Sequence, residues 1–457
     1  MSTQVIANLP SCSMGNTCDK VSMKTTSSTE RQRASLEELW MSRKNNQLYN
    51  TSYPLSPDDW KKYRRAGELD FSGVRQLAFY IHIPFCRHLC PFCEYKRTTT
   101  PSKEIQQRYL SGLETDVKAF IDKYPDVELS GFDIGGGTPT ALSTANFGRL
   151  MDLYKHTVQR LHLSAQYEPS IEGTFQTLTT EKTRMITAAG FRRVSLGIQS
   201  ANKLVQQSNG RINPDSAFML QTINTLRTEG VEKINIDLMY GLKGQDLPHL
   251  QNDLDLIEIL SPEHVTLYEF RPNLLGVNEN MSKEELYRSY NFLYKGLTAL
   301  GYNSRFGQNT FSKNSTDKGL SSYLRNRMFH FMPYKGFGIA AQSMSPQGIS
   351  YNIGKEGNRL DTELLLSNTF PAADCYLLPR HELLSKYLAV SAYGGFISFE
   401  VANRILKDDF GKVFDAEIRF CLDRGLMDRH KDRLRITPEG FKHYGATFSL
   451  FYKTTEQ

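Results

Sequence analysis

The alternation of two kinds of segment between Leu77 and Phe311 constrains the fold more than any other feature of the sequence. Short runs of β-branched and aromatic residues are followed by a polar or glycine-containing turn and then by a longer run with helical spacing. The strand candidates are LAFYIHI (77–83), SGFDI (130–134), LSAQYE (163–168), RVSLGI (193–198), KINIDL (233–238) and HVTLYEF (264–270). Strands separated by helices pair in parallel through right-handed crossovers. The sequence therefore predicts an α/β fold with a partial (βα)6 barrel, two units short of the closed form.

The first helix candidate shows the helical spacing well. Its apolar residues recur in four-residue steps and Pro125 follows them closely; they are Tyr109, Leu113, Val117 and Ile121. Residues at this spacing share one face of a helix. We therefore expect this face to pack against the sheet.

The segments outside the alternation predict three further regions. Residues 1–33 are rich in Ser, Thr and Asn and are interpreted as a disordered extension. Residues 34–76 are aromatic and basic and predict a subdomain that packs on the barrel. The barrel core spans 77–315, and 316–457 forms a mostly helical C-terminal domain. Within it, a helix ending at Arg424–Gly425 and the strand-like runs LMDRH and RLRIT predict a winged-helix-like unit.

Charge and hydropathy exclude several classes of partner. Lysine and arginine number 55 against 49 acidic residues, giving a net charge of +6 with no basic run. The charges on the winged-helix segment alternate in sign, so we expect it to pack or to cover a substrate rather than to bind nucleic acid. No apolar stretch reaches the roughly 20 residues of a membrane span, and the first residues do not resemble a signal peptide. We expect a cytoplasmic protein without a membrane partner.

The seven cysteines are unevenly spaced, which argues against a disulfide framework. Cys12 and Cys18 lie in the N-terminal extension and are interpreted as free thiols, with an accessory metal site as the alternative. Cys375 and Cys421 stand alone and are expected to be core thiols. The other three form the spacing C-x3-C-x2-C directly after the first strand candidate; they are Cys86, Cys90 and Cys93.

Three thiolates within eight residues indicate a metal site. Structural zinc takes four ligands and would have to recruit His82 or His88. A 4Fe-4S cluster normally takes four cysteines, so three would leave one iron open to another ligand. We favour the cluster, and zinc remains the alternative.

The cysteine spacing, with Phe92 just before the third cysteine, resembles the signature of the radical S-adenosylmethionine superfamily. The resemblance implies that the open iron binds the amino and carboxylate groups of S-adenosylmethionine. It also implies that an electron from the cluster cleaves the sulfonium to methionine and a 5'-deoxyadenosyl radical. The loop after the second strand would contact the amino group, unless it is a plain turn; its residues are Gly135, Gly136, Gly137 and Thr138.

Three further segments resemble one branch of that superfamily. RRVSLGIQS (192–200), NGR (209–211) and INIDLMYGLKGQ (234–245) are similar to the oxygen-independent coproporphyrinogen III dehydrogenase-like branch, which includes a haem chaperone and C-methyltransferases or cyclopropanases. The S-adenosylmethionine contacts that this resemblance implies are Tyr80, Glu172, Gln199, Arg211 and Asp237.

Some of these assignments have alternatives. Glu168 is nearly as well placed as Glu172, and Gln199 and Asp237 could be satisfied polar groups at strand ends. GFGIAAQSMS (336–345) and EFRPNLLG (269–276) resemble site-closing segments, or are ordinary turns.

Glu94 and Tyr95 mark the main departure from the branch, because the dehydrogenases carry a further cysteine two positions after the third. We therefore expect a radical enzyme that abstracts hydrogen from an organic substrate, with a tetrapyrrole as the leading candidate. The reaction would be an oxidoreductase or C-methyltransferase reaction with a 4Fe-4S cluster, one or two molecules of S-adenosylmethionine and a flavodoxin- or ferredoxin-type reductant. The alternatives are a haem-binding chaperone, the dehydrogenase itself and a zinc-stabilised nucleic-acid binder.

Overall fold

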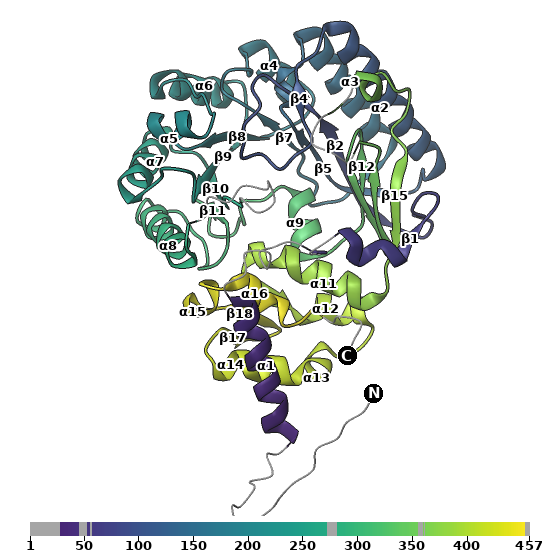
Figure 1. The fold of residues 1–457 in the computed structure, drawn as a ribbon. Coiled ribbons are helices and arrows are strands. Elements are labelled where there is room, and N and C mark those ends of the chain that lie inside the picture. Colours follow the sequence, from purple (N-terminus) through teal and green to yellow (C-terminus); the bar gives the residue numbers. More distant parts are fainter. Residues whose placement is uncertain are drawn as a thin grey trace, which may run out of the picture.

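A computed structural model describes residues 28–44, 53–54, 57–271, 281–354, 360 and 362–452. Within these ranges the chain forms one large sheet flanked by helices, and a smaller C-terminal unit of helices around a three-stranded sheet (Figure 1). Cys12 and Cys18 lie outside the described residues.

Parallel strands form the centre of the large sheet and pair with one another in chain order. They are β2 (Gln76–Ile83), β5 (Glu128–Gly136), β7 (Ser170–Gly173), β8 (Arg193–Gln199), β9 (Lys233–Tyr240) and β10 (His264–Glu269). The predicted α/β fold with a parallel sheet is confirmed. All of these strands except β7 lie where the sequence places them.

The third strand candidate, 163–168, is wrong. Only a two-residue strand, β6 (His162–Leu163), lies there, and the amide of Tyr167 donates to the Ser164 carbonyl in a turn. The apolar–polar alternation of this segment reflects a surface turn, in which Leu163 is 46% exposed. The true strand, β7, follows Pro169 and is too short to show a period of its own.

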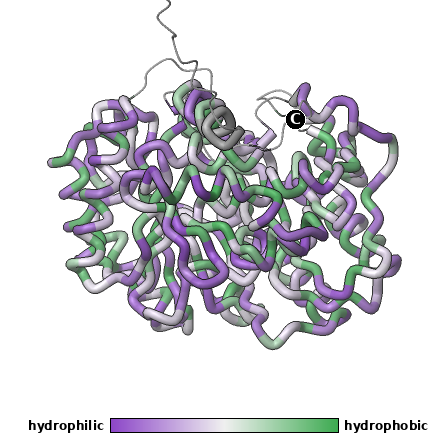
Figure 2. The backbone as a smooth tube through the Cα atoms, turned by 90° about the horizontal axis from the view of Figure 1, so that it is seen from below, coloured by the Kyte–Doolittle hydropathy of each residue, from purple (hydrophilic) through white to green (hydrophobic). Residues whose placement is uncertain are grey.

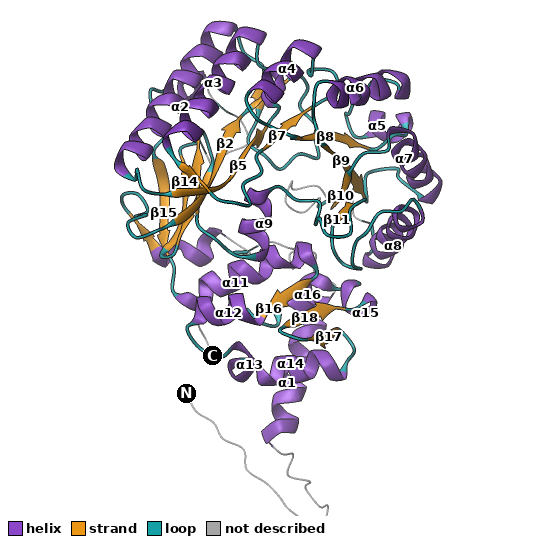
Figure 3. Cartoon of the chain, turned by 180° about the vertical axis from the view of Figure 1, so that it is seen from behind, coloured by secondary structure: helices purple, strands orange, loops and turns teal. Residues whose placement is uncertain are grey.

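Helices cover the outer face of the parallel sheet (Figure 3). They are α2 (Lys103–Lys123), α3 (Thr144–Arg160), α4 (Thr180–Ala188), α5 (Lys203–Ser208), α6 (Ser216–Thr228), α7 (Leu247–Leu260) and α8 (Lys283–Ala299). Helix α2 begins after its cap residue Ser102 and buries the whole predicted face, from Tyr109 to Ile121. The expected packing of this helix is confirmed.

The expectation of a mostly helical chain after residue 316 is wrong for residues 334–377. Here four strands extend the large sheet beyond β2: β12 (Tyr334–Phe337), β13 (Gln342–Ser345), β14 (Gly348–Asn352) and β15 (Ala372–Leu377). A Cβ atom on Gly336 would lie 2.3 Å from the Gln342 carbonyl oxygen, and one on Gly348 would lie 1.9 Å from that of Tyr376. Short, glycine-containing strands of this kind lack the apolar period that a sequence reading needs.

The smaller unit contains the strand pair expected near residue 430. It is built from α11 (Arg380–Ser391), the 3-10 helix η4 (Ala392–Gly394), β16 (Phe396–Ser398), α12 (Phe399–Leu406), α13 (Phe410–Val413), α14 (Asp415–Asp423), β17 (Met427–His430), β18 (Arg433–Ile436), α15 (Pro438–Phe441) and α16 (Tyr444–Ser449). Strands β17 and β18 form the expected antiparallel hairpin. Cys421 is buried in this unit and Cys375 in the large sheet, as expected for core thiols.

The N-terminal helix differs from its expectation. Helix α1 begins at Ser28, inside the segment interpreted as disordered, and ends at Lys44. It packs on α14 and α16 of the C-terminal unit (Figure 1), not on the barrel. Trp40 is 4% exposed and meets His443 edge to face. The Arg43 side chain donates to the Ser449 carbonyl at 2.7 Å. Of the described residues that follow α1, η1 (Pro57–Tyr63) and β1 (Arg64–Arg65) contact β15 of the large sheet.

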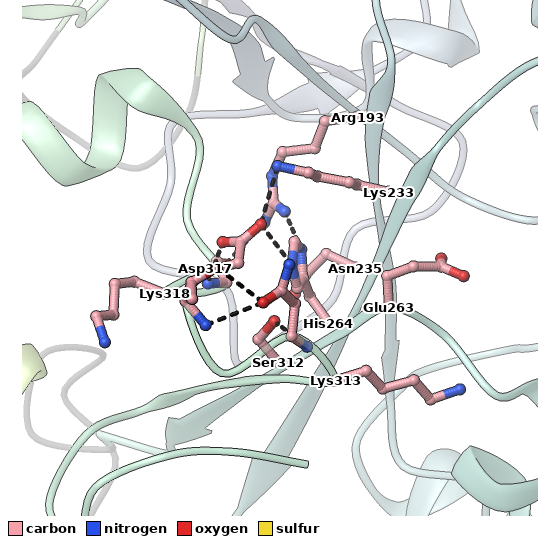
Figure 4. A network of polar contacts seen from close by, with 12 residues as sticks. Arg193, Lys233, Asn235, Glu263, His264, Ser312, Lys313, Asp317 and Lys318 are labelled. Atoms are coloured by element: carbon pink, nitrogen blue, oxygen red, sulfur yellow. Dashed lines mark hydrogen bonds and ion pairs between the residues drawn. The ribbon is translucent and has the colours of Figure 1, made fainter. Parts of the chain in front are cut away.

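A polar network joins the first residues of β8, β9 and β10 to the loop around Asp317 (Figure 4). Asp317 accepts from Lys233 Nζ at 2.9 Å and lies 3.3 Å from His264 Nε2. Arg193 contacts His264 and donates to the Gly319 carbonyl. The network lies at the opposite ends of the strands from the loops that carry catalytic groups in such folds, so we assign it a structural role.

We expect Asp317→Ala to lower the free energy of unfolding by about 2–3 kcal/mol, somewhat below the roughly 3–5 kcal/mol of a fully buried pair. Although burial opposes it, hydrogen bonds from His264 and Lys233 hold the pKa of Asp317 below its ordinary value. The stabilisation is thus fully present above about pH 4 and is lost as the pH falls further. Urea titrations at pH 7 and pH 3.5 measure both effects. Glu232→Ala, which removes an exposed partner of Arg192, serves as control and should change little.

Apolar and polar stretches alternate along the backbone instead of gathering into one block (Figure 2). Among the described residues, no helix combines the length and the apolar character that crossing a bilayer requires.

Candidate active site

A cavity of about 230 Å³ opens where the carboxyl ends of the parallel strands meet. The residues predicted as site residues that line it are Cys86, Cys90, Phe92, Cys93, Gly136, Gly137, Thr138, Glu172, Gln199, Arg211 and Asp237. Tyr80 and Gly135 do not line it. Tyr80 stacks on Tyr323, and Gly135 lies beneath the Glu172 carboxyl group. Segments far apart in the sequence thus converge on one cavity.

The cysteine loop follows β3 (Phe85–Cys86), which pairs with β4 (Thr98–Thr99). The hydroxyl group of Thr138 lies 3.7 Å from Cys86 Sγ, and Arg211 Nη1 lies 3.6 Å from Cys90 Sγ. Burial raises the pKa of Cys86 to about 11 and also raises the pKa of Cys93. These thiols therefore keep their protons unless a bound cation displaces them, as metal binding does.

The donor set fits an iron–sulfur cluster. Within the described part of the chain, no three His, Cys, Asp or Glu side chains are grouped as ligands of one ion. In a cluster each thiolate binds a different iron, so its ligands stand further apart than those of a single ion. Cys86, Cys90 and Cys93 all line one cavity, as ligands of a single cluster must. Of the histidines that zinc would recruit, His88 lines the cavity, whereas His82 Nε2 lies 2.8 Å from the Lys96 carbonyl oxygen.

The glycine loop after β5 is more than an ordinary turn. The amide of Gly136 donates to Glu172 Oε2 at 3.1 Å, and its φ of +109° is a conformation that favours glycine. A Cβ atom on Gly137 would lie 2.8 Å from the Pro84 carbonyl carbon. Glycine therefore lets this loop pack directly against the strand that leads into the cysteines.

The Asn-Gly-Arg motif fastens a second loop to the cysteines. Asn209 Nδ2 donates to the carbonyl groups of Val205 and Lys243. A Cβ atom on Gly210 would lie 2.8 Å from Pro91 Cδ, so only glycine permits this approach. Arg211 then reaches Cys90 and also donates to the Gly197 carbonyl. Gly197 belongs to β8, and this strand has an irregular register between Gly197 and Gln199. Gln199 has a φ of +69°.

The carboxyl groups of Glu172 and Asp237 both belong to residues that line the cavity. Burial, reinforced by the charge of Asp237, raises the pKa of Glu172 to about 8. Burial raises the pKa of Asp237 to about 6, although Asn235 and Ser195 donate to it at 2.8 and 3.2 Å. Such carboxyl groups are prepared to accept hydrogen bonds from a cationic ligand, which would restore their charge.

Glu168, the alternative to Glu172, does not line the cavity. Its carboxylate pairs with Lys233 at the far ends of the strands. The placement therefore favours Glu172.

Several cavity residues were not identified from the sequence. They are Glu94, Tyr95, Arg97, Gly173, Thr174, Ser195, Gly197, Met239, Tyr268 and Tyr393. For Tyr268, its position at the end of β10 was a usable signal. Tyr393 gave none, because it comes from η4 in the C-terminal unit.

The two expected site-closing segments have different outcomes. Residues 336–345 form the hairpin of β12 and β13 and do not line the cavity. Of 269–276, Glu269 and Arg271 line it, and Arg271 pairs with Glu94 at 2.6 Å. Residues 272–276 lie outside the described residues.

Comparison with known proteins agrees with this geometry. The model of the radical SAM superfamily matches residues 80–257, a range that contains the cysteine motif, the glycine loop and Asp237. Residues 80–257 therefore match the radical S-adenosylmethionine superfamily.

Longer matches cover more of the chain. The heme chaperone HemW of Bacillus subtilis is 24% identical, over 81% of this chain and 98% of its own. The oxygen-independent coproporphyrinogen III oxidase of Salmonella typhimurium is 29% identical, over 66% of this chain and 69% of its own. The solved structure of coproporphyrinogen III oxidase (HemN) from Escherichia coli shares the fold, with a TM-score of 0.69 at 23% identity over 83% of this chain and 91% of that one. The chain is therefore similar both to HemN and to HemW.

Proposed function

We propose that the protein is a radical S-adenosylmethionine enzyme that abstracts hydrogen from a tetrapyrrole, in an oxidoreductase or C-methyltransferase reaction. The observation that carries this proposal is the single cavity in which the three cysteines, the glycine loop, Arg211 and Asp237 meet. Relatives named for coproporphyrinogen and for heme support a tetrapyrrole as substrate.

Cys86, Cys90 and Cys93, which line the cavity, would hold a 4Fe-4S cluster. When bound, the cluster supplies the electron that cleaves S-adenosylmethionine to methionine and a 5'-deoxyadenosyl radical. Glu172 and Asp237 accept hydrogen bonds from the cofactor, and Arg211 and Gln199 orient it. Phe92 and Met239 exclude water from the cavity, which protects a radical from side reactions.

We further propose the finer domain organisation. The parallel strands with their helices form a partial (βα)6 barrel over 77–315. Residues 316–457 extend the large sheet with β12 to β15 and then form a C-terminal unit that includes a winged-helix-like part. A flavodoxin- or ferredoxin-type protein supplies the electron. The position of Tyr393 supports a covering role for the C-terminal unit.

Transfer of heme without turnover is the second candidate. It is favoured by the near full-length match to the B. subtilis heme chaperone. The discriminating experiment reduces the reconstituted protein anaerobically with S-adenosylmethionine and measures 5'-deoxyadenosine by chromatography. The same assay also measures the tetrapyrrole, because only an enzyme converts it to a product. Heme that binds and is recovered unchanged supports the chaperone.

We expect coproporphyrinogen III to keep its carboxylates in this assay, because Glu94 and Tyr95 stand where the dehydrogenases carry a further cysteine. Mass analysis of the porphyrins measures this directly. Release of S-adenosylhomocysteine or methylthioadenosine beside 5'-deoxyadenosine would identify transfer from a second S-adenosylmethionine. Stoichiometric loss of two carboxylates would instead make the protein a coproporphyrinogen III dehydrogenase.

A further inference from the structure

A second cavity of about 180 Å³ adjoins the first. The residues that line both cavities are Tyr95, Glu172, Ser195, Asp237, Tyr268 and Tyr393. Its strand residues lie two apart, such as Arg193 and Ser195 on β8 or Asn235 and Asp237 on β9. Residues at this spacing point to the same face of a sheet, so the cavity lies on the inner face of the barrel.

Helix α9 (Ser322–Phe329) forms the wall of this cavity opposite the inner face of the later strands. It packs against β5 and β2 and lies between the sheet and the C-terminal unit (Figure 1). The helix brings the guanidinium of Arg327 into the cavity.

Arg327 is held in place by neutral groups. Its Nη1 donates to the Tyr323 hydroxyl at 3.2 Å, and its Nη2 donates to Gln342 Oε1 at 3.1 Å. The guanidinium carbon lies 5.0 Å from the centre of the Tyr334 ring. No carboxylate pairs with Arg327 among the residues that the structure describes. An arginine remains charged even when buried, and these contacts leave donors of its planar fork free to face the cavity.

The carboxyl groups of the cavity are engaged by other donors. Asp133 accepts from Ser321 at 2.7 Å, Glu172 from the Gly136 amide, and Asp237 from Ser195 and Asn235. Among the residues that the structure describes, none of these carboxyl groups forms an ion pair with Arg327.

Aromatic rings line the passage between the two cavities. Tyr95, Tyr268 and Tyr393 line both, and Tyr95 exposes 62% of its surface even though it faces the site. Such rings suit a flat or apolar ligand body, while a single charged group fixes its orientation.

We propose that Arg327 binds a carboxylate of the substrate and so fixes how the rest of the molecule faces the site cavity. This inference rests on the proposed function and makes Arg327 a specificity-determining residue. The guanidinium fork matches a carboxylate bidentately, and a charge-assisted pair out of bulk water is strong. Substrates without a carboxylate would leave the guanidinium unpaired.

The test compares two ligands on the full-length, anaerobically reconstituted protein. Coproporphyrin III carries four carboxylates; its tetraamide keeps the size and the polar groups but lacks the negative charge. Fluorescence titration gives the dissociation constant of each. We expect the wild-type protein to bind the acid more tightly, and Arg327→Gln to weaken acid binding about 10- to 100-fold while leaving tetraamide binding nearly unchanged. Arg327→Lys should recover part of the difference.

Arg325→Gln is the matched control, because Arg325 lies on the same helix but donates to the Gln166 carbonyl and does not line the cavity. It should bind both ligands as the wild type does. Circular dichroism establishes that each variant is folded. Equal binding of acid and tetraamide by the wild type, no binding of either, or an Arg327→Gln variant that still prefers the acid would overturn the inference. Cleavage of S-adenosylmethionine by the wild-type preparation tests the proposed function separately.

Discussion

Replacing Cys86, Cys90 and Cys93 together by alanine should abolish iron binding and the visible absorbance of the protein. Anaerobically reconstituted wild type should be brown and hold about four irons, because three thiolates with one open iron match a 4Fe-4S cluster. The three cysteines line one cavity. Because burial raises the pKa of the Cys86 thiol, this thiol needs a bound cation to become a thiolate. Iron and sulfide analysis with absorbance spectra measures the effect.

Cys375→Ala controls for the loss of a buried thiol. Cys375 is 3% exposed but does not line the cavity, so its replacement should leave the iron content unchanged. Stoichiometric zinc in the wild type, together with failure of iron reconstitution, would contradict the cluster assignment.

The parallel sheet could be predicted because its strands are long enough to show their pattern. β2 carries a nearly continuous apolar run, the first part of β9 alternates apolar and polar residues, and α2 shows a clean four-residue period. The third strand could not be predicted, because β7 spans only Ser170–Gly173 and the neighbouring turn imitates an alternating strand. Strands β12 to β15 were missed for a related reason. Their pairing depends on close backbone approach at Gly336 and Gly348, a tertiary property that no local period records.

The candidate site divides in the same way. Local motifs carry their own spacing, so the cysteines, Gly136 and Arg211 were placed in the cavity from the sequence. Tyr80, implied by the same resemblance, stacks on Tyr323 and does not line the cavity, so its contact with the cofactor stays a prediction. Arg327 was not identified, because it reaches the site only through the packing of α9 across the inner face of the sheet.

Asp237→Ala should strongly reduce the cleavage of S-adenosylmethionine while leaving the iron content intact. Asp237 lines the cavity and accepts hydrogen bonds from Ser195 and Asn235, so its replacement leaves the cysteine ligands in place. A lost hydrogen bond to a charged partner costs about 1.5–3 kcal/mol, which corresponds to roughly 10- to 100-fold. We expect this loss in 5'-deoxyadenosine formation at subsaturating cofactor, measured beside iron content on one preparation. Arg211→Ala should also reduce this cleavage. Because Arg211 contacts Cys90, its replacement is expected to affect the iron content as well.

Asp255→Ala provides the matched control for Asp237→Ala, because Asp255 is an exposed residue of α7 whose carboxylate accepts only a local hydrogen bond from Gln251. Its cleavage rate should equal that of the wild type. Asp237→Asn separates charge from shape, since the amide keeps the size of the side chain but cannot offer a negative charge to a cationic ligand. If Asp237→Asn lowers the cleavage of S-adenosylmethionine as much as Asp237→Ala does, the negative charge of Asp237 orients the cofactor. A neutral amide of the same size cannot stabilise a cationic ligand in this way. Full activity of both Asp237 variants would remove this residue from the cofactor site and leave Glu172 as the acidic contact.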